Sequence, residues 1–257
     1  MKNNFFNKIV KILSKKYNKT INITDLKKIF YTLWETNNKK IYKQIYRLKH
    51  KGYLISLRKD LFFVKKPDQQ IDLDWLIENL YWQLLKKKIN NDLPTKNRYI
   101  WGLKALEINI WNYNIPDNIL IINDKKDSLE KIAWDKKVIF TTYKAWSKDY
   151  IKIVKKFLQK IKIGKYTFPY SNLELAILES LYNPNELEKN YIYELIKKIL
   201  RKKWKKLNFE IFEVLLKNNK FHTSINRLYK LAKLTNPKVA ENLKNIIKKY
   251  SYFLEID

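Results

Sequence analysis

Apolar residues recur at spacings of three and four over the first fifty positions, a pattern that predicts three amphipathic helices. Their inner faces are Phe5, Phe6, Ile9, Val10 and Leu13; Leu26, Ile29, Phe30 and Leu33; and Ile41, Ile45 and Leu48. We expect the first helix to end near 17–18 and Thr24 to cap the second. The polar turn 36–38 is expected to cap the third, and Gly52 to supply its left-handed stop.

A different pattern follows the third helix. Residues 54–57 and 61–64 are strand-like runs on either side of a basic tip at 58–60, which is typical of a β-hairpin. The order helix, helix, turn, helix, hairpin predicts a winged helix-turn-helix domain over residues 1–66. The polar segment 67–74 is expected to link it to a second domain, residues 67–257.

The remaining three quarters of the chain indicate a mixed region followed by a helical one. Helical patterns are expected over 75–85 and within 99–110, and strands over 119–122, 138–142 and 160–168. Five more helices are expected over 173–182, 191–200, 209–218, 225–234 and 240–250, with a final strand over 252–256. The predicted fold class is therefore α+β: an N-terminal winged helix-turn-helix, then a mixed α/β and finally mainly helical C-terminal domain.

Charge adds to this picture through its distribution. The chain of 257 residues carries a formal charge of +29, but Lys, Asn and Ile are abundant as in AT-rich genomes, so the total alone says little. Residues 1–66 hold 18 basic and 3 acidic residues, and residues 67–257 hold 36 and 22. The first quarter of the chain thus carries half of the excess positive charge, which favours a polyanionic partner for that quarter.

Composition excludes several chemistries. Without Cys there are no disulfides, thiolate nucleophiles or zinc-cysteine sites, and the three Gly cannot form a nucleotide-binding loop. We therefore expect no cofactor, no resident metal and no catalytic residue. No uncharged run reaches the ~18 residues that a membrane span needs, so we expect a cytoplasmic protein without a membrane partner.

The third predicted helix carries the candidate DNA contacts, because no acidic residue interrupts its basic stripe. In a helix-turn-helix this helix enters the major groove, where Gln pairs with adenine and Arg with guanine. Gln44 and Arg47 are the expected base readers. The phosphate contacts are expected from Lys39, Lys40, Lys43 and Lys51 on the helix, and from Arg58 and Lys59 on the hairpin tip.

Four segments resemble the AbiEi-like regulators, the antitoxins of AbiE-type abortive-infection systems, also called type IV toxin-antitoxin systems. They are the helix-to-hairpin passage 48–54 leading into 58–62, the segment 99–106, the helix start 171–176 and the helix segment 224–228. The sequence departs from the family pattern at Asp60, where a Gly is usual, at Asn172 in place of Pro, and at Asn226 and Tyr229.

The resemblance implies a sequence-specific DNA-binding regulator that represses its own promoter at operator repeats in double-stranded DNA. It also implies that the C-terminal domain neutralises a nucleotidyltransferase-type toxin, directly or indirectly, as part of a phage-defence module. No periodicity or spacing in the chain indicates antitoxin activity independently of this likeness.

Two alternative functions stay open from the residues. The first is a protein-interaction module whose winged helix does not read DNA. The second is a metal-dependent nuclease that uses Asp117 and Asp135, which precede predicted strands.

Glu174 and Glu179 lie five apart on one predicted helix, where they diverge, so we expect no catalytic carboxylate pair. The basic cluster 201–206 either extends a DNA footprint or is a solvated helix end.

Overall fold

The computed structural model describes residues 2–142, 150–182, 184, 186–218 and 221–250. The chain divides into two compact units. The amino-terminal unit comprises Met1–Tyr81 and Lys131–Lys136, and the carboxyl-terminal unit comprises Trp82–Glu130 and Lys137–Asp257. The expected boundary between residues 66 and 67 stays a prediction.

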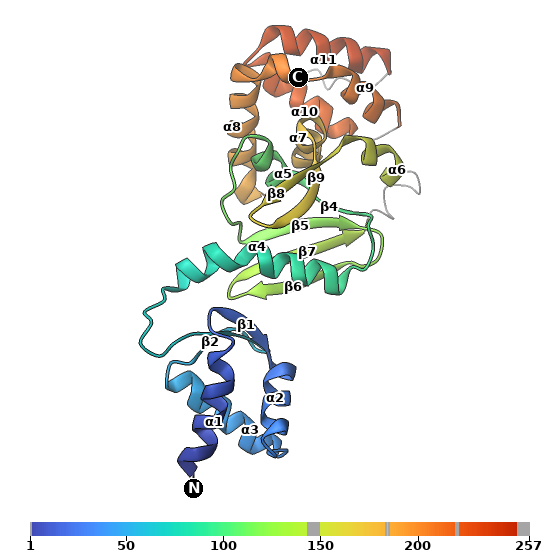
Figure 1. Ribbon diagram of the computed structural model, residues 1–257. Coiled ribbons are helices and arrows are strands. Elements are labelled where there is room, and N and C mark those ends of the chain that lie inside the picture. The colour runs from blue at the N-terminus through green and yellow to red at the C-terminus, as the bar shows by residue number, and fades with distance from the viewer. Residues whose placement is uncertain (1, 143–149, 183, 185, 219–220, 251–257) are drawn as a thin grey trace. The chain divides into compact units, whose positions relative to one another are not determined.

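The fold is mixed α and β, as expected in outline. The described residues form eleven α-helices and two β-sheets, of three and six strands (Figure 1). Within this part of the chain we find no helix with the length and apolar content that crossing a bilayer requires.

The amino-terminal unit packs three helices with a small antiparallel sheet. Its elements are α1 (Lys2–Ser14), β1 (Lys19–Asn22), α2 (Ile23–Thr32), α3 (Asn38–His50), β2 (Leu54–Arg58) and β3 (Leu61–Val64). The strand order is β1-β3-β2, with Thr20 opposite Phe63 and Ile55 opposite Phe63 on the other side. The sequence pattern did not predict β1, because a four-residue strand leaves almost no period of its own.

The predicted apolar faces form the core of this unit. Ile9 and Leu13 of α1, Leu26 and Phe30 of α2, and Leu48 of α3 are all fully buried. Burying an aliphatic or aromatic side chain of this size stabilises the fold by about 1.5–3 kcal/mol. The expected helices therefore form because their apolar stripes meet one another.

Helix capping agrees with the sequence only in part. The expectation that Thr24 caps α2 was wrong: Asn22 is the N-cap, and its side chain accepts a hydrogen bond from the backbone N–H of Asp25. Asn37 caps α3 by accepting from the N–H of Lys40, as the polar turn predicted. Gly52 ends α3 with φ +74°, the left-handed conformation expected there.

Two tryptophans occupy the left-handed position that glycine usually takes at helix ends. Trp34 follows α2 with φ +66°, and Trp111 follows α5 (Gly102–Asn109) with φ +67°. The backbone N–H of each tryptophan donates to a carbonyl oxygen of the preceding helix. The N–H of the next residue does the same: Glu35 donates to the carbonyl of Phe30, and Asn112 to that of Glu107. These are Schellman turns, which leave the backbone strained when the residue is not glycine.

Replacing Trp111 by Gly is therefore expected to give a more stable protein than replacing it by Ala. Its side chain is 75% exposed, so both variants lose the same modest contacts, whereas only Gly relieves the strain of φ +67°. We expect the Gly variant to exceed the Ala variant by about 1 kcal/mol in free energy of unfolding. Urea denaturation of both variants measures this, and an Ala variant equal to or above Gly would contradict the strain.

The carboxyl-terminal unit is built on a six-stranded sheet of order β6-β7-β5-β4-β9-β8. β5 and β7 are parallel, β4 and β9 are parallel, and the β4–β5 and β8–β9 pairs are antiparallel. The strands are β4 (Arg98–Ile100), β5 (Asn118–Asn123), β6 (Ser128–Ala133), β7 (Lys136–Thr142), β8 (Leu158–Ile163) and β9 (Tyr166–Ser171).

Helices complete the unit: α5 and α7 (Leu173–Tyr182) pack on the sheet, and the carboxyl-terminal helices form a group beyond α7 (Figure 1). Besides α5 and α7 they are α4 (Leu73–Asp92), α6 (Tyr150–Val154), α8 (Glu186–Lys202), α9 (Phe209–Lys217), α10 (His222–Lys233) and α11 (Pro237–Lys249), with 3-10 turns at Lys155–Phe157 and Trp204–Lys206. The first nine residues of α4 belong to the amino-terminal unit. The five predicted carboxyl-terminal helices are present: α7 has the predicted bounds, and the ends of the other four differ from those predicted.

Several sequence expectations for this unit need correction. The predicted strand 160–168 is a hairpin of β8 and β9, because Gly164 turns the chain with φ +58°. The helical segment 99–110 begins only at Gly102, since residues 98–100 pair with β5 as strand β4. β6 was missed, and the predicted strand 252–256 lies outside the described residues.

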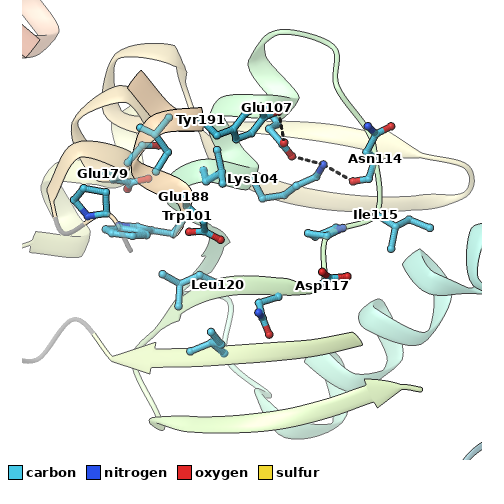
Figure 2. Close-up of a pocket in the computed structure, with 17 residues that line it drawn as sticks. Trp101, Lys104, Glu107, Asn114, Ile115, Asp117, Leu120, Glu179, Glu188 and Tyr191 are labelled. Atoms are coloured by element: carbon cyan, nitrogen blue, oxygen red, sulfur yellow. Dashed lines mark hydrogen bonds and ion pairs between the residues drawn. The ribbon is translucent and has the colours of Figure 1, made fainter. Parts of the chain in front are cut away.

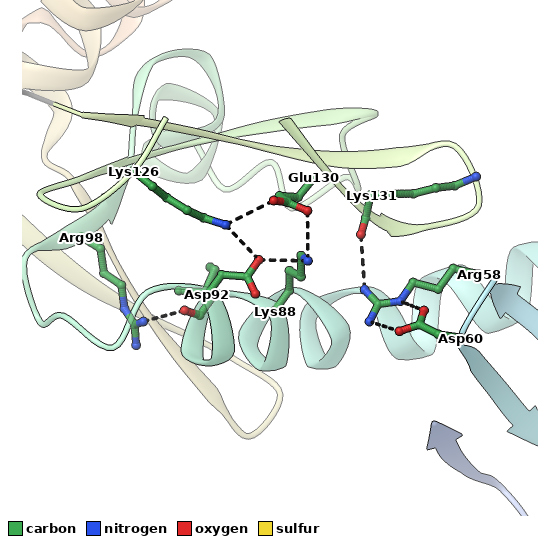
Figure 3. Close-up of polar contacts among 9 residues, drawn as sticks. Arg58, Asp60, Lys88, Asp92, Arg98, Lys126, Glu130 and Lys131 are labelled. Carbon is green, nitrogen blue, oxygen red and sulfur yellow. Dashed lines mark hydrogen bonds and ion pairs between the residues drawn. The ribbon is translucent and has the colours of Figure 1, made fainter. Parts of the chain in front are cut away.

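Four charged side chains hold the end of α4 to the β5–β6 turn and to strand β6 (Figure 3). Lys88 Nζ lies 2.9 Å from Asp92 Oδ2 and 3.2 Å from Glu130 Oε2, and Lys126 Nζ lies 3.4 Å and 3.2 Å from the same two carboxylates. The hydrogen bonds from Lys126 and Lys88 lower the pKa of Glu130. The network compensates four of the charges in this unit, so these lysines add little to its net positive field.

Candidate functional site

The outward face of α3 is the candidate nucleic-acid interface. Its buried residues lie on one side of the helix, so the 100° rotation per residue places Lys39, Lys43, Tyr46 and His50 on the opposite side. All four are exposed. The first turn of α3 contains no acidic residue. The amino end of a helix carries the positive pole of its dipole, so lysines there are repelled by that pole. Their presence at this end is favourable when an anion binds to them.

The predicted phosphate contacts at the start of α3 are available to a ligand. Lys39, Lys40 and Lys43 are all exposed. Lys40 Nζ lies 3.9 Å from Glu35 Oε2, but its side chain remains 68% exposed, and a solvated pair at this distance contributes little. These three lysines therefore present ammonium groups on and beside the outward face.

The predicted base readers lie on the flank of α3 that faces α1. The Arg47 guanidinium stacks on the ring of Phe6 at 4.4 Å from its centroid, and Lys51 Nζ lies 5.7 Å from the same ring. Gln44 is half-buried, and its Oε1 is a buried atom without a hydrogen-bond partner among the described residues. The assignment of base reading to Gln44 and Arg47 stays a prediction, and it requires Arg47 to leave the Phe6 ring.

At the hairpin tip, Arg58 is engaged within its own unit (Figure 3). Its Nε donates to Asp60 Oδ1 at 2.7 Å and its Nη2 to Asp60 Oδ2 at 3.3 Å, a bidentate pair. A further bond runs from Nη1 to the carbonyl oxygen of Lys131. Lys59 is exposed. Of the two tip residues, Lys59 is thus the one whose charge is displayed to a ligand.

Each of the three acidic residues in the first 66 has a cationic neighbour. Asp25 lies 3.5 Å from Lys28 Nζ, Glu35 lies beside Lys40, and Asp60 binds Arg58. The segment holds 18 basic residues in all, so 15 of them remain beyond those three pairs. The field at the surface of this segment is therefore strongly positive.

Sequence reasoning missed the exposed aromatic residues around α3. Trp34 is 93% exposed, Tyr46 69% and Tyr42 53%, and Lys27 Nζ lies 5.0 Å from the Tyr42 ring centroid. A helical projection of α3 was the signal that could have found Tyr46, because it falls opposite Ile41 and Leu48.

A cavity of about 620 Å³ lies in the carboxyl-terminal unit, within the ~300–1,000 Å³ range of small-molecule pockets (Figure 2). Its walls come from α5, α7 and α8, from the segment before β5, and from Leu120 and Ile139 on the sheet. Lys104 in this wall is 3% exposed and donates to Glu107 Oε2 at 2.8 Å and to the carbonyl oxygens of Asn112 and Asn114. Lys104 and Glu107 therefore neutralise each other's charge, and their hydrogen bonds hold this wall of the cavity in place.

Glu179 of α7 is a fully buried carboxyl beside the cavity. It accepts hydrogen bonds from Tyr99 Oη at 3.0 Å, from the N–H of Gly102 at 3.0 Å and from Ser171 Oγ at 2.6 Å. Tyr150 Oη lies 3.0 Å from Tyr99 Oη. Burial raises the pKa of Glu179 to about 8, even though its hydrogen-bond donors favour the ionised form. The hydrogen bonds around the Glu179 carboxyl therefore connect β4, α5, α6, β9 and α7.

Glu174, the other carboxyl of α7, has separate partners. Its Oε1 accepts from the backbone N–H of Asn208 at 2.8 Å, and burial raises its pKa. The two carboxyls therefore diverge, as their spacing predicted. The fixed hydrogen bonds of both indicate roles in holding α7 within the unit.

The two nuclease candidates occupy different surroundings. Asp117 lies at the start of β5 and lines the cavity, whereas the Asp135 side chain is 71% exposed and lies 3.7 Å from Lys136 Nζ. Over the residues described, no group of three or more His, Asp or Glu side chains is arranged to hold a metal ion. In the cluster 201–206, Trp204 is half-buried and Lys205 and Lys206 are exposed.

No protein-family profile and no curated protein sequence matches the chain. Among solved structures, it is similar to the RV2827C protein from Mycobacterium tuberculosis, with a TM-score of 0.56 and 12% sequence identity. The likeness covers 96% of this chain and 81% of that one. At this identity the likeness concerns the fold alone, and we conclude that this chain and the mycobacterial protein share a mixed α/β architecture over most of their length.

Proposed function

We propose that the amino-terminal unit is a winged helix-turn-helix that binds double-stranded DNA, and that the protein is a non-enzymatic, sequence-specific transcriptional regulator. The observation that carries this proposal is the outward face of α3, which is basic, exposed and free of acidic residues. The element order α1-β1-α2-α3-β2-β3, with β1 hydrogen-bonded to β3, also supports it, because this order suits a recognition helix followed by a wing.

In this proposal α3 enters the major groove with its amino end first. Lys39, Lys40 and Lys43 neutralise phosphates, and Lys59 on the hairpin contacts the backbone beside the groove. Gln44 and Arg47 then read base edges, for which Arg47 exchanges the Phe6 ring for a guanine edge. The exchange is feasible because a partly exposed stacking contact of this kind contributes only about 0.5–1 kcal/mol, and the released guanidinium can form a bidentate pair with guanine.

The proposed biological role follows from the family resemblance. If the chain is an AbiEi-like antitoxin, the DNA sites are operator repeats at its own promoter, and the carboxyl-terminal unit counteracts a nucleotidyltransferase-type toxin. This part of the proposal rests on the resemblance alone, and co-expression with the neighbouring gene product in a growth assay tests it.

The test of DNA binding is a comparison between the chain's own upstream DNA and a scrambled duplex across a salt series. We expect the upstream duplex to bind about a thousandfold more tightly or better at physiological salt. Sequence-independent phosphate binding weakens steeply with salt, so it would vanish from both duplexes together. Equal, salt-sensitive binding to both duplexes would contradict the proposal and favour the protein-interaction module.

A further inference from the structure

Trp34 is poorly explained by the needs of the fold. Its side chain is 93% exposed, and its backbone adopts φ +66°, which costs about 1–2 kcal/mol for a residue with a Cβ. The equivalent position after α3 is Gly52, with φ +74°. A glycine would thus satisfy the turn after α2 without exposing an indole to water. Strained positions of this kind persist where function retains them.

Trp34 adjoins the helix of the proposed DNA interface along the chain. Trp34 lies in the turn between α2 and α3, and its neighbour Glu35 lies 3.9 Å from Lys40 Nζ and accepts from the N–H of Asn37, the N-cap of α3. The indole is therefore attached next to the amino end of α3. The exposed side chains in the first two turns of α3 include Lys39, Lys40 and Lys43.

We propose that Trp34 packs its indole against the sugar–phosphate backbone of the DNA duplex that α3 binds, with Nε1–H donating to a phosphate oxygen. This inference rests on the proposed function. The flat apolar ring fits the face of a deoxyribose, and the indole N–H is a donor with no charge. Charge complementarity selects the occupant, since the exposed lysines at the start of α3 attract a polyanion and repel a basic protein surface.

Trp111 provides a matched control for this residue. It also follows a helix in a Schellman turn, with φ +67° and 75% exposure, but it belongs to the carboxyl-terminal unit. Trp34→Gly and Trp111→Gly therefore remove the same side chain from the same backbone geometry. We expect both variants to melt at or above the wild-type temperature, because glycine relieves the strained φ in each.

Only Trp34→Gly is expected to weaken DNA binding, by about tenfold. The loss should be equal on the upstream and the scrambled duplex, because a backbone contact carries no sequence information. The slope of log affinity against log salt should not change, since no cation is removed. Trp34→Phe, which keeps a ring but loses the N–H, is expected to recover part of the affinity.

The outcomes separate this inference from the proposed function. If wild type prefers its upstream duplex and Trp34→Gly binds DNA as tightly as Trp111→Gly, the inference is overturned and the proposed function stands. Loss confined to the upstream duplex would overturn it too, because Trp34 would then read bases. If wild type has no duplex preference, both proposals fail. A fluorescence change on adding DNA that disappears in Trp34→Phe supports the contact directly.

Discussion

Replacing Lys39 and Lys43 together by Glu is expected to lower the affinity for duplex DNA by about a hundredfold or more at low salt. Both side chains are exposed on the outward face of α3, one helical turn apart, and neither forms an ion pair with an acidic group in the described part of the chain. In the proposed complex each neutralises a phosphate. Glutamate at these positions would add repulsion to the loss of attraction.

The salt dependence makes this prediction specific. A lysine that contacts phosphate contributes about one unit to the slope of log affinity against log salt, so the double variant should show a slope shallower by about two. Lys8 and Lys11 are exposed on α1 of the same unit, and their double replacement by Glu changes the net charge equally. Comparable losses in both double variants would show that total charge, and not α3, controls binding.

The second large effect concerns protons on Glu179. In the folded protein this carboxyl keeps its proton up to about pH 8, whereas its ordinary pKa of 4.5 applies once the chain unfolds. Between these values the folded state binds more protons than the unfolded state, so the free energy of unfolding falls as the pH rises. The contribution of Glu179 is fully present below pH 4.5 and is lost toward about pH 8, at up to about 1.4 kcal/mol per pH unit.

Glu179→Gln should flatten this dependence, because glutamine resembles the protonated carboxyl. Its oxygen can accept from Gly102 and Ser171 while its amide donates to Tyr99, whose hydroxyl can in turn donate to Tyr150. Relative to wild type, the variant should gain stability steadily from pH 5 to pH 8 in urea denaturation. Glu194→Gln, at an exposed site on α8, is the control. Parallel pH curves for wild type and Glu179→Gln would contradict a raised pKa.

The local elements with a strong apolar period were predictable. The stripes at Ile9 and Leu13, Leu26 and Phe30, and Leu48 alone define α1 to α3, since a 3.6-residue period fixes which face is buried. Strands β1, β4 and β6 were not predictable. β1 and β4 have only four and three residues, and their hydrogen-bond partners lie far away in sequence, as with Lys19 opposite Val64. β6 pairs with the neighbouring strand β7, but its sequence SLEKIA has little β propensity.

Some features of the candidate site were predictable from the sequence, and others depend on how the helices pack. The basic character of α3 and the absence of acids from it are properties of the sequence. Which of its residues face outward depends on where α1 packs: Arg47 lies on Phe6, and Tyr46 takes the exposed centre of the face. Likewise, only the fold shows that Asp60 holds Arg58.

By itself the sequence determined the helical stripes, the concentration of positive charge in the first 66 residues and the lack of cysteine or glycine-loop chemistry, because these depend on residue type and nearest neighbours. Only the tertiary structure decided that Glu179 is buried among Tyr99, Gly102 and Ser171, and that Trp34 stays exposed. The physical reason is that burial and pKa depend on groups brought together from distant parts of the chain, which no local spacing encodes.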